Sequence, residues 1–132
     1  MTYKEKLSKF IIAKRNLINL YTELDYIANE DIEEIESWPE GKCKIVYEHI
    51  VEYIIKSIDV PISTITDDSI TCPWCVYISK IKKYNDCDSC GYGKRNGVCD
   101  KSGSKYRQIT DEGGFTFITK KDYLNIINNI GN

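Results

Sequence analysis

The sequence has few of the features that identify enzymes and membrane proteins. Its 132 residues include one histidine, one methionine and three prolines. There is no glycine-rich phosphate loop of the Walker or dinucleotide type, no serine elbow and no HExxH metalloprotease motif. No apolar run approaches the roughly 20 residues that a membrane-spanning helix needs. The sequence therefore predicts neither a common catalytic site nor a membrane span.

The composition does support one folded unit. Hydrophobic residues make up 42% of the chain and charged residues 29%, with a formal net charge of −2, which is typical of a globular protein. The N-terminal residues Met-Thr-Tyr-Lys-Glu-Lys lack the apolar core and cleavage site of a secretory signal. We therefore expect a cytoplasmic protein, in which cysteines stay reduced and serve as metal ligands or redox groups.

Hydrophobic spacing predicts a mainly α-helical fold with a small α+β portion. Apolar residues three, four or seven positions apart predict a long helix over 3–28, and only Lys14 interrupts its apolar stripe. Asn29 is expected to cap a short helix over 30–37. A third helix is expected over 42–58.

The last part of the chain is expected to form a β-hairpin and a helix. Residues 108–110 and 115–118 flank Asp-Glu-Gly-Gly, which is typical of a hairpin loop. Thr119 and Asp122 form an N-cap signal for a helix over 120–130. The predicted organisation is a single compact unit with three parts. These are a helical region (1–71), a cysteine-rich module (72–107), and the hairpin with the C-terminal helix (108–132). The third part is expected to pack back on the helical region.

Five of the six cysteines lie within 28 residues. Two CxxC pairs stand in this segment, and that spacing lets two sulfurs face one metal ion at about 2.3 Å. Gly91 follows the second pair, where it permits a positive φ and a close approach of amide groups to the sulfurs. The sequence predicts a zinc-knuckle-like module with zinc ligands Cys72, Cys75, Cys87 and Cys90, and with Cys99 as an alternate ligand in place of Cys87 or Cys90.

Other chemistries remain open for these thiols. A 4Fe-4S cluster needs the same thiolates, and the fifth cysteine keeps it in consideration. A redox role would use Cys72 and Cys75. Redox CxxC motifs lie where a strand leads into a helix, and the sequence does not predict such a junction here. Cys43 is expected to be a buried hydrophobic residue on a helix. His49 is expected to be structural or exposed rather than a metal ligand.

The cysteine segment also resembles a recurring motif. The two CxxC pairs, the continuation Gly91-Tyr92-Gly93-Lys94, and the later Gly-Val-Cys and Ser-Lys-Tyr runs are similar to a motif of small, mostly uncharacterised proteins of phages, mobile elements and methanogenic archaea. Those proteins commonly have proline where this chain has Gly91. The resemblance covers residues 72–109, and it implies a metal-binding module without an assigned activity.

Charge is unevenly distributed along the chain. Residues 1–60 carry 8 basic and 12 acidic side chains, whereas residues 79–108 carry 8 basic and 3 acidic ones. A basic segment with interleaved tyrosines can contact nucleic acid through phosphates and base stacking. Alternatively, these lysines offset the negative charge of the thiolates. The candidate nucleic-acid contacts are Lys80, Lys82, Lys83, Lys94, Arg95, Lys101, Lys105 and Arg107.

The sequence as a whole predicts a non-enzymatic, zinc-binding regulatory protein of phage or mobile-element type. It would act through a protein partner, for example by docking to or inhibiting a host or defence complex. The first alternative is a nucleic-acid-binding zinc protein that uses the basic 80–107 stretch. The second is an iron–sulfur protein with redox or sulfur-transfer activity.

Overall fold

The computed structural model describes residues 1–20, 22, 25–56, 71–82, 90–96, 104, 108–109 and 119–130, with Lys82 described by its backbone alone. All regular elements in these ranges are helices, which confirms the predicted mainly α-helical fold. Of the predicted hairpin, Gln108 and Ile109 are helical, and residues 110–118 lie outside the described residues. None of the described helices is both long and apolar enough to span a bilayer.

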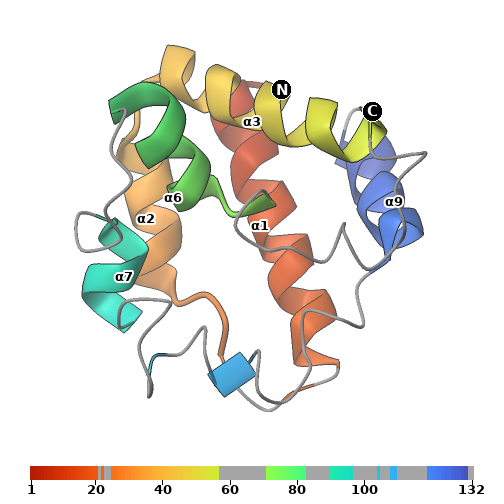
Figure 1. Cartoon of the computed structure of the whole chain (residues 1–132), viewed down its shortest axis with the longest axis horizontal. Coiled ribbons are helices and arrows are strands. Elements are labelled where there is room, and N and C mark those ends of the chain that lie inside the picture. The colour runs from red at the N-terminus through yellow and green to blue at the C-terminus, as the bar shows by residue number, and fades with distance from the viewer. Residues whose placement is uncertain are drawn as a thin grey trace.

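Three helices build the body of the fold. Helix α1 (Tyr3–Asn19) runs through the middle, α3 (Glu40–Lys56) crosses one end of it, and α9 (Lys120–Ile130) lies along one side (Figure 1). The core between them is apolar, because each helix turns one hydrophobic face inward. Its buried side chains are Leu7, Phe10, Ile11 and Ile18 of α1, Val46, Ile50 and Ile54 of α3, and Tyr123, Ile126 and Ile130 of α9.

A second group of helices lies on the opposite side of α1 from α9 (Figure 1). It consists of α2 (Asn29–Ser37), α6 (Pro73–Val76), the π-helix η2 (Tyr77–Lys82) and α7 (Gly91–Asn96). Helix α2 contacts both α1 and α7, and α6 contacts α3. Trp38, directly after α2, stacks on Tyr77 with ring centroids 4.2 Å apart. The helices next to the cysteines therefore pack directly on the helical body.

The first helix ends at Asn19, whereas the spacing of apolar residues predicted residue 28. Both the backbone N–H and the hydroxyl of Thr22 donate to the carbonyl of Ile18. Beyond this point Tyr26 and Ile27 are both buried. The chain leaves the helix after Asn19 and still contributes both side chains to the core.

The N-termini of α2 and α9 test the two predicted helix caps. Asn29 lies inside α2, and the capping position belongs to Ala28, so the predicted cap is wrong. The backbone N–H of Ala28 instead donates to the carboxylate of Asp31 at 2.9 Å. Helix α9 begins as predicted, because Thr119 and Asp122 each accept the other's backbone N–H, at 3.2 and 2.9 Å.

Lys14, which interrupts the apolar stripe of α1, has no exposed surface. Its Nζ donates to Thr71 Oγ1 at 3.0 Å and lies 5.4 Å from the ring centroid of Tyr26. Thr71 Oγ1 also lies 3.4 Å from the hydroxyl of Tyr123. A buried ammonium group is costly unless it is hydrogen-bonded, and this network satisfies part of that need. It also links α1 and α9 to the residue that precedes Cys72.

The substitution Thr71→Val tests this network. It keeps the side-chain shape but removes the hydroxyl that bonds Lys14 and Tyr123, so we expect a loss of about 1–3 kcal/mol in the free energy of unfolding. Urea unfolding followed by circular dichroism measures the loss. Thr71→Ser retains the hydroxyl and is the matched control. An equal loss in both variants would show that the threonine methyl group, rather than the hydrogen bonds, matters.

Candidate metal centre

Cys90 lies in an environment suited to a bound thiolate. It stands directly before α7 and its side chain is 5% exposed. Burial, together with the nearby Cys72, raises the pKa of the Cys90 thiol to about 11, although hydrogen bonds from the backbone N–H groups of Gly93 and Tyr92 act to lower it. Amide hydrogen bonds to sulfur are the supporting contacts that metal-bound thiolates use. The predicted approach of amide groups to sulfur is therefore present at Cys90.

The first CxxC pair opens the neighbouring helix. Cys72 is buried at the N-cap of α6, and Cys75 is half-buried one turn later. Cys72 lies near enough to Cys90 to raise the pKa of its thiol, although the two residues are 18 positions apart in the chain. Since Thr71 is fixed by Lys14, the entry to this pair is anchored on α1.

The predicted ligand set stays untested. Cys72 lies near enough to Cys90 to raise the pKa of its thiol, and Cys87 and Cys99 lie outside the described residues. Within the described ranges, no three His, Cys, Asp or Glu side chains converge as a metal-binding group. The four-thiolate site therefore stays a prediction.

Cys43 and His49 both lie on α3, apart from this site. Cys43 is fully buried, with its sulfur 3.8 Å from the carbonyl oxygens of Ile35 and Trp38, which confirms the prediction of a buried residue. His49 is half-buried. Burial and the nearby Lys80 lower the pKa of His49, and Glu52 acts in the opposite direction.

A buried carboxylate fixes α7 on α2. Asp31 has no exposed surface and accepts from Arg95 Nε at 2.6 Å and from Asn96 Nδ2 at 3.1 Å. Arg95 also pairs with Glu34 at 2.5 Å. Burial would lower the pKa of Arg95, but its hydrogen bonds to Asp31 and Glu34 outweigh this effect and raise it. Together with the hydrogen bond from the Tyr92 hydroxyl to the carbonyl of Tyr26, at 2.7 Å, these contacts hold α7 on the helical body.

Gly91 is needed for space rather than for an unusual backbone conformation. It is the first residue of α7, so the predicted positive φ is wrong. A Cβ atom at this position would overlap the carboxylate of Glu34. Because Arg95 holds that carboxylate in place, glycine allows α2 and α7 to approach at this point.

The basic residues of the segment have different surroundings. Arg95 is committed to Asp31 and Glu34, so it does not offer its charge freely to nucleic acid. Lys80 and Lys94 are exposed. The side chains of Lys82, Lys83, Lys101, Lys105 and Arg107 lie outside the described residues. The nucleic-acid contacts thus stay a prediction, which the pairing of Arg95 weakens.

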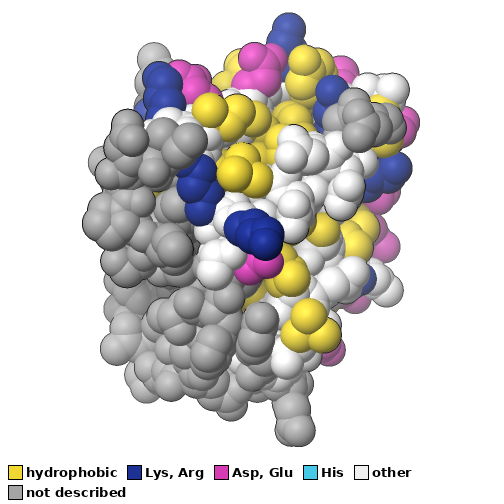
Figure 2. All heavy atoms as spheres, turned by 90° about the vertical axis from the view of Figure 1, so that its right-hand side faces the viewer, with side chains coloured by type: hydrophobic (Ala, Val, Ile, Leu, Met, Phe, Trp, Pro, Cys, Tyr) yellow, Lys and Arg dark blue, Asp and Glu magenta, His cyan; other side chains and the backbone are white. Residues whose placement is uncertain are grey.

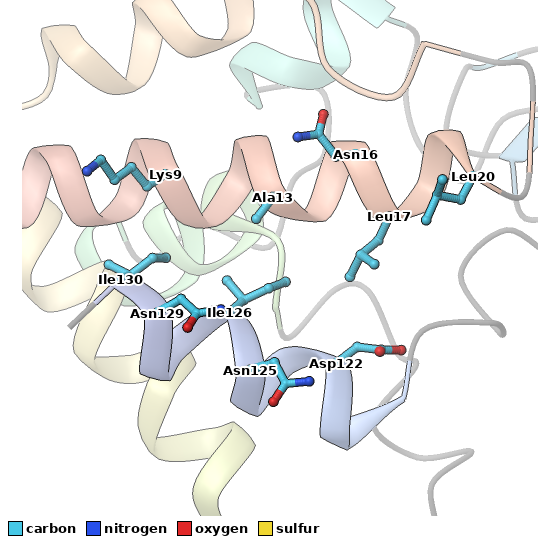
Figure 3. Close-up of a pocket in the computed structure, with 10 residues that line it drawn as sticks. All are labelled: Lys9, Ala13, Asn16, Leu17, Leu20, Asp122, Asn125, Ile126, Asn129 and Ile130. Carbon is cyan, nitrogen blue, oxygen red and sulfur yellow. The ribbon is translucent and has the colours of Figure 1, made fainter. Parts of the chain in front are cut away.

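A groove of about 450 Å³ runs between α1 and α9 (Figure 3). Ala13, Leu17, Ile126 and Ile130 form its apolar part, and asparagine amides line its edges. The face that contains α9 shows hydrophobic side chains set among uncharged polar ones (Figure 2). Lys9 lies toward one end of the groove and Asp122 toward the other (Figure 3).

A smaller cavity, which the sequence did not predict, lies beside the cysteines. It has a volume of about 210 Å³, and both tryptophans of the chain, Trp38 and Trp74, line it. The indole N–H of Trp74 is buried and has no hydrogen-bond partner among the described residues. A buried donor in this state costs about 1–3 kcal/mol. In the sequence, the position of Trp74 between Cys72 and Cys75 was the feature that could have indicated this cavity.

Comparison of the chain with protein-family models, with curated proteins and with solved structures found no match. The resemblance of residues 72–109 to the cysteine motif of phage and archaeal proteins therefore rests on its residues alone.

The substitution Asp31→Asn tests the attachment of α7. It leaves Arg95 without its buried counter-charge, and breaking a fully buried pair costs about 3–5 kcal/mol. Because the Arg95 side chain is 31% exposed, we expect a loss of about 2–3 kcal/mol in the free energy of unfolding. Glu34→Gln removes the other carboxylate paired with Arg95 and, as a more exposed control, should cost under about 1 kcal/mol. Equal losses in urea unfolding would contradict the special role of Asp31.

Proposed function

We propose that this chain is a non-enzymatic zinc-binding protein that acts through a protein partner. The observation that carries the proposal is the approach of Cys72 and Cys90. These residues come from separate CxxC turns, and backbone N–H groups of Tyr92 and Gly93 bond to the Cys90 sulfur. A cation among such buried cysteines stabilises their deprotonated thiolate form relative to the protonated thiol.

The donor set favours zinc in a structural role. Four cysteine thiolates form a closed tetrahedral site with no position for a substrate, and such zinc sites stabilise the fold rather than catalyse a reaction. Cys75 follows Cys72 by three positions, and Cys87 precedes Cys90 by three. Each pair would supply two ligands to one ion. The eight basic residues of 79–108 offset the charge of the thiolates.

The proposed role of zinc is to hold the cysteine-rich segment against the helical body. Residues 72–107 contain few aliphatic side chains, so hydrophobic burial alone gives this segment little stability. Metal-binding energy is folding energy in such a module. The helical body has its own core between α1, α3 and α9 and does not share this dependence.

The proposed partner site is the groove between α1 and α9. Its apolar floor and amide edges fit the apolar stripe of an amphipathic helix, which is a common way for a helix to bind in a groove. Lys9 and Asp122, toward the two ends, would select a partner helix with an acidic residue near Lys9 and a basic residue near Asp122.

Metal analysis of cysteine variants tests the zinc site. The purified wild-type chain should contain about one zinc ion, and Cys72→Ser, Cys75→Ser, Cys87→Ser and Cys90→Ser should each lose most of it. Cys43→Ser is the matched control, since Cys43 is buried on α3 beside the carbonyls of Ile35 and Trp38, and it should retain zinc. Atomic absorption measures the metal content.

Three outcomes would change this assignment. Full zinc retention in Cys72→Ser and Cys90→Ser would overturn it. Retention in Cys87→Ser with loss in Cys99→Ser would select the alternate ligand. Iron with broad visible absorption in anaerobically purified protein would replace zinc by an iron–sulfur cluster.

Metal removal tests whether the cysteine-rich segment depends on zinc for its stability while the helical body does not. A chelator should expose backbone amides of α6 and α7 to hydrogen exchange first, while amides of α1, α3 and α9 stay protected, because only the first group depends on the metal. Hydrogen exchange with mass spectrometry distinguishes the two groups. Simultaneous loss of protection in all five helices would contradict this division.

A further inference from the structure

The groove between α1 and α9 contains apolar surface that reaches the outside of the molecule. Leu20, directly after α1, is 74% exposed, and among the described residues it is the most exposed large hydrophobic side chain. It lines the groove together with Leu17, Ala13, Ile126 and Ile130. A single exposed leucine is common on monomers, but this one extends an apolar groove. The groove therefore has the character of an interaction surface.

The two charged side chains among the described residues of the groove lie diagonally across it. Lys9 is on α1 at one end, and Asp122 is on α9 at the other end (Figure 3). The carboxylate of Asp122 accepts the backbone N–H and the hydroxyl of Thr119 through Oδ2, at 2.9 and 3.0 Å. Its Oδ1 is not used in these bonds and can accept from an ammonium group. A twofold rotation about an axis through the middle of the groove therefore exchanges the places of a positive and a negative charge.

We propose that this groove docks a second copy of the chain, in a dimer with twofold symmetry. In such an interface the same surface meets itself, and every contact occurs twice. Lys9 would pair with Asp122 of the partner subunit, and Asp122 with Lys9 of the partner subunit. The inference rests on the proposed partner site, since a second copy supplies the acidic residue near Lys9 and the basic residue near Asp122 that the groove requires.

The uncharged part of the groove also suits a copy of itself. Asn16, Asn125 and Asn129 line it and are exposed. A primary amide both donates and accepts hydrogen bonds, so identical amides can pair across a twofold axis where identical charges would repel. The twofold also directs the exposed Leu20 toward the end of the partner's groove that contains Ile130 (Figure 3). Two α1–α9 pairs would then enclose one apolar core, as in a four-helix bundle.

Sedimentation velocity of the full-length protein over a concentration series tests the dimer. The mass should rise toward twice the 15.3 kDa of one chain. Leu20→Gln removes apolar area that the partner would cover, and it should weaken dimerisation about 10-fold. Ile55→Gln is the matched control, because Ile55 is 54% exposed on α3 and does not line the groove. It should leave dimerisation unchanged.

Two charge variants test the diagonal pairing. Lys9→Glu places carboxylates opposite each other at both ends of the dimer and should weaken dimerisation about 10-fold. Asp122→Asn removes the charge but keeps an oxygen for the bonds from Thr119, and it should weaken dimerisation about 3-fold. Lys42→Glu changes an exposed lysine of α3 outside the groove and should have no effect.

A mixture of the two charge variants gives the sharpest result. A dimer with one chain of each kind keeps one Lys9–Asp122 pair and has no like-charge contact at its other end. Native mass spectrometry, with one variant ¹⁵N-labelled, should therefore show more heterodimer than random exchange gives.

Three outcomes overturn the dimer. These are a chain that stays monomeric up to about 1 mM, equal effects of Leu20→Gln and Ile55→Gln, and random mixing of the charge variants. Zinc content is measured in the same samples, since no cysteine lines the groove. A monomer that contains zinc contradicts only the dimer, whereas a dimer without zinc contradicts only the zinc site.

Discussion

Two charged side chains without exposed surface position the cysteine-bearing elements. Lys14 in α1 bonds Thr71 directly before Cys72, and Asp31 in α2 bonds Arg95 and Asn96 in α7, directly after Cys90. A buried charge tolerates little displacement of its partners, since lost hydrogen bonds leave it unsolvated. The positions of Cys72 and of the start of α7 are thereby set relative to the helical body.

The same contacts explain the uneven distribution of charge along the sequence. The acidic N-terminal part and the basic cysteine segment meet where Asp31 and Glu34 face Arg95. Part of the basic charge thus serves internal attachment of α7 rather than an external polyanion. Lys80 and Lys94 remain exposed.

The sequence predicted features that depend on neighbouring residues and missed those that depend on distant ones. The N-cap of α9 was predicted correctly because Thr119 and Asp122 are three positions apart. The pairing of Asp31 with Arg95 spans 64 positions, and no local pattern indicates it. Periodicity also extended α1 too far, because Tyr26 and Ile27 are buried without being helical, and apolar spacing alone does not distinguish the two cases. Of the candidate site, spacing identified the cysteines but not the cavity beside Trp74, which α2, α6, η2 and α7 line together.

The π-helix η2 has a consequence for how this protein can vary. A π-helix closes i→i+5 hydrogen bonds, so each of its turns holds about one residue more than an α-helical turn. Here it continues α6 directly from Tyr77 to Lys82. A descendant chain that lost one residue within this stretch could resume ordinary α-helical winding while keeping Cys72, Trp74 and Cys75 in place. We therefore expect the loss of one residue after Tyr77 to be better tolerated than the same loss inside the CxxC turn, where it would alter the spacing of the sulfurs.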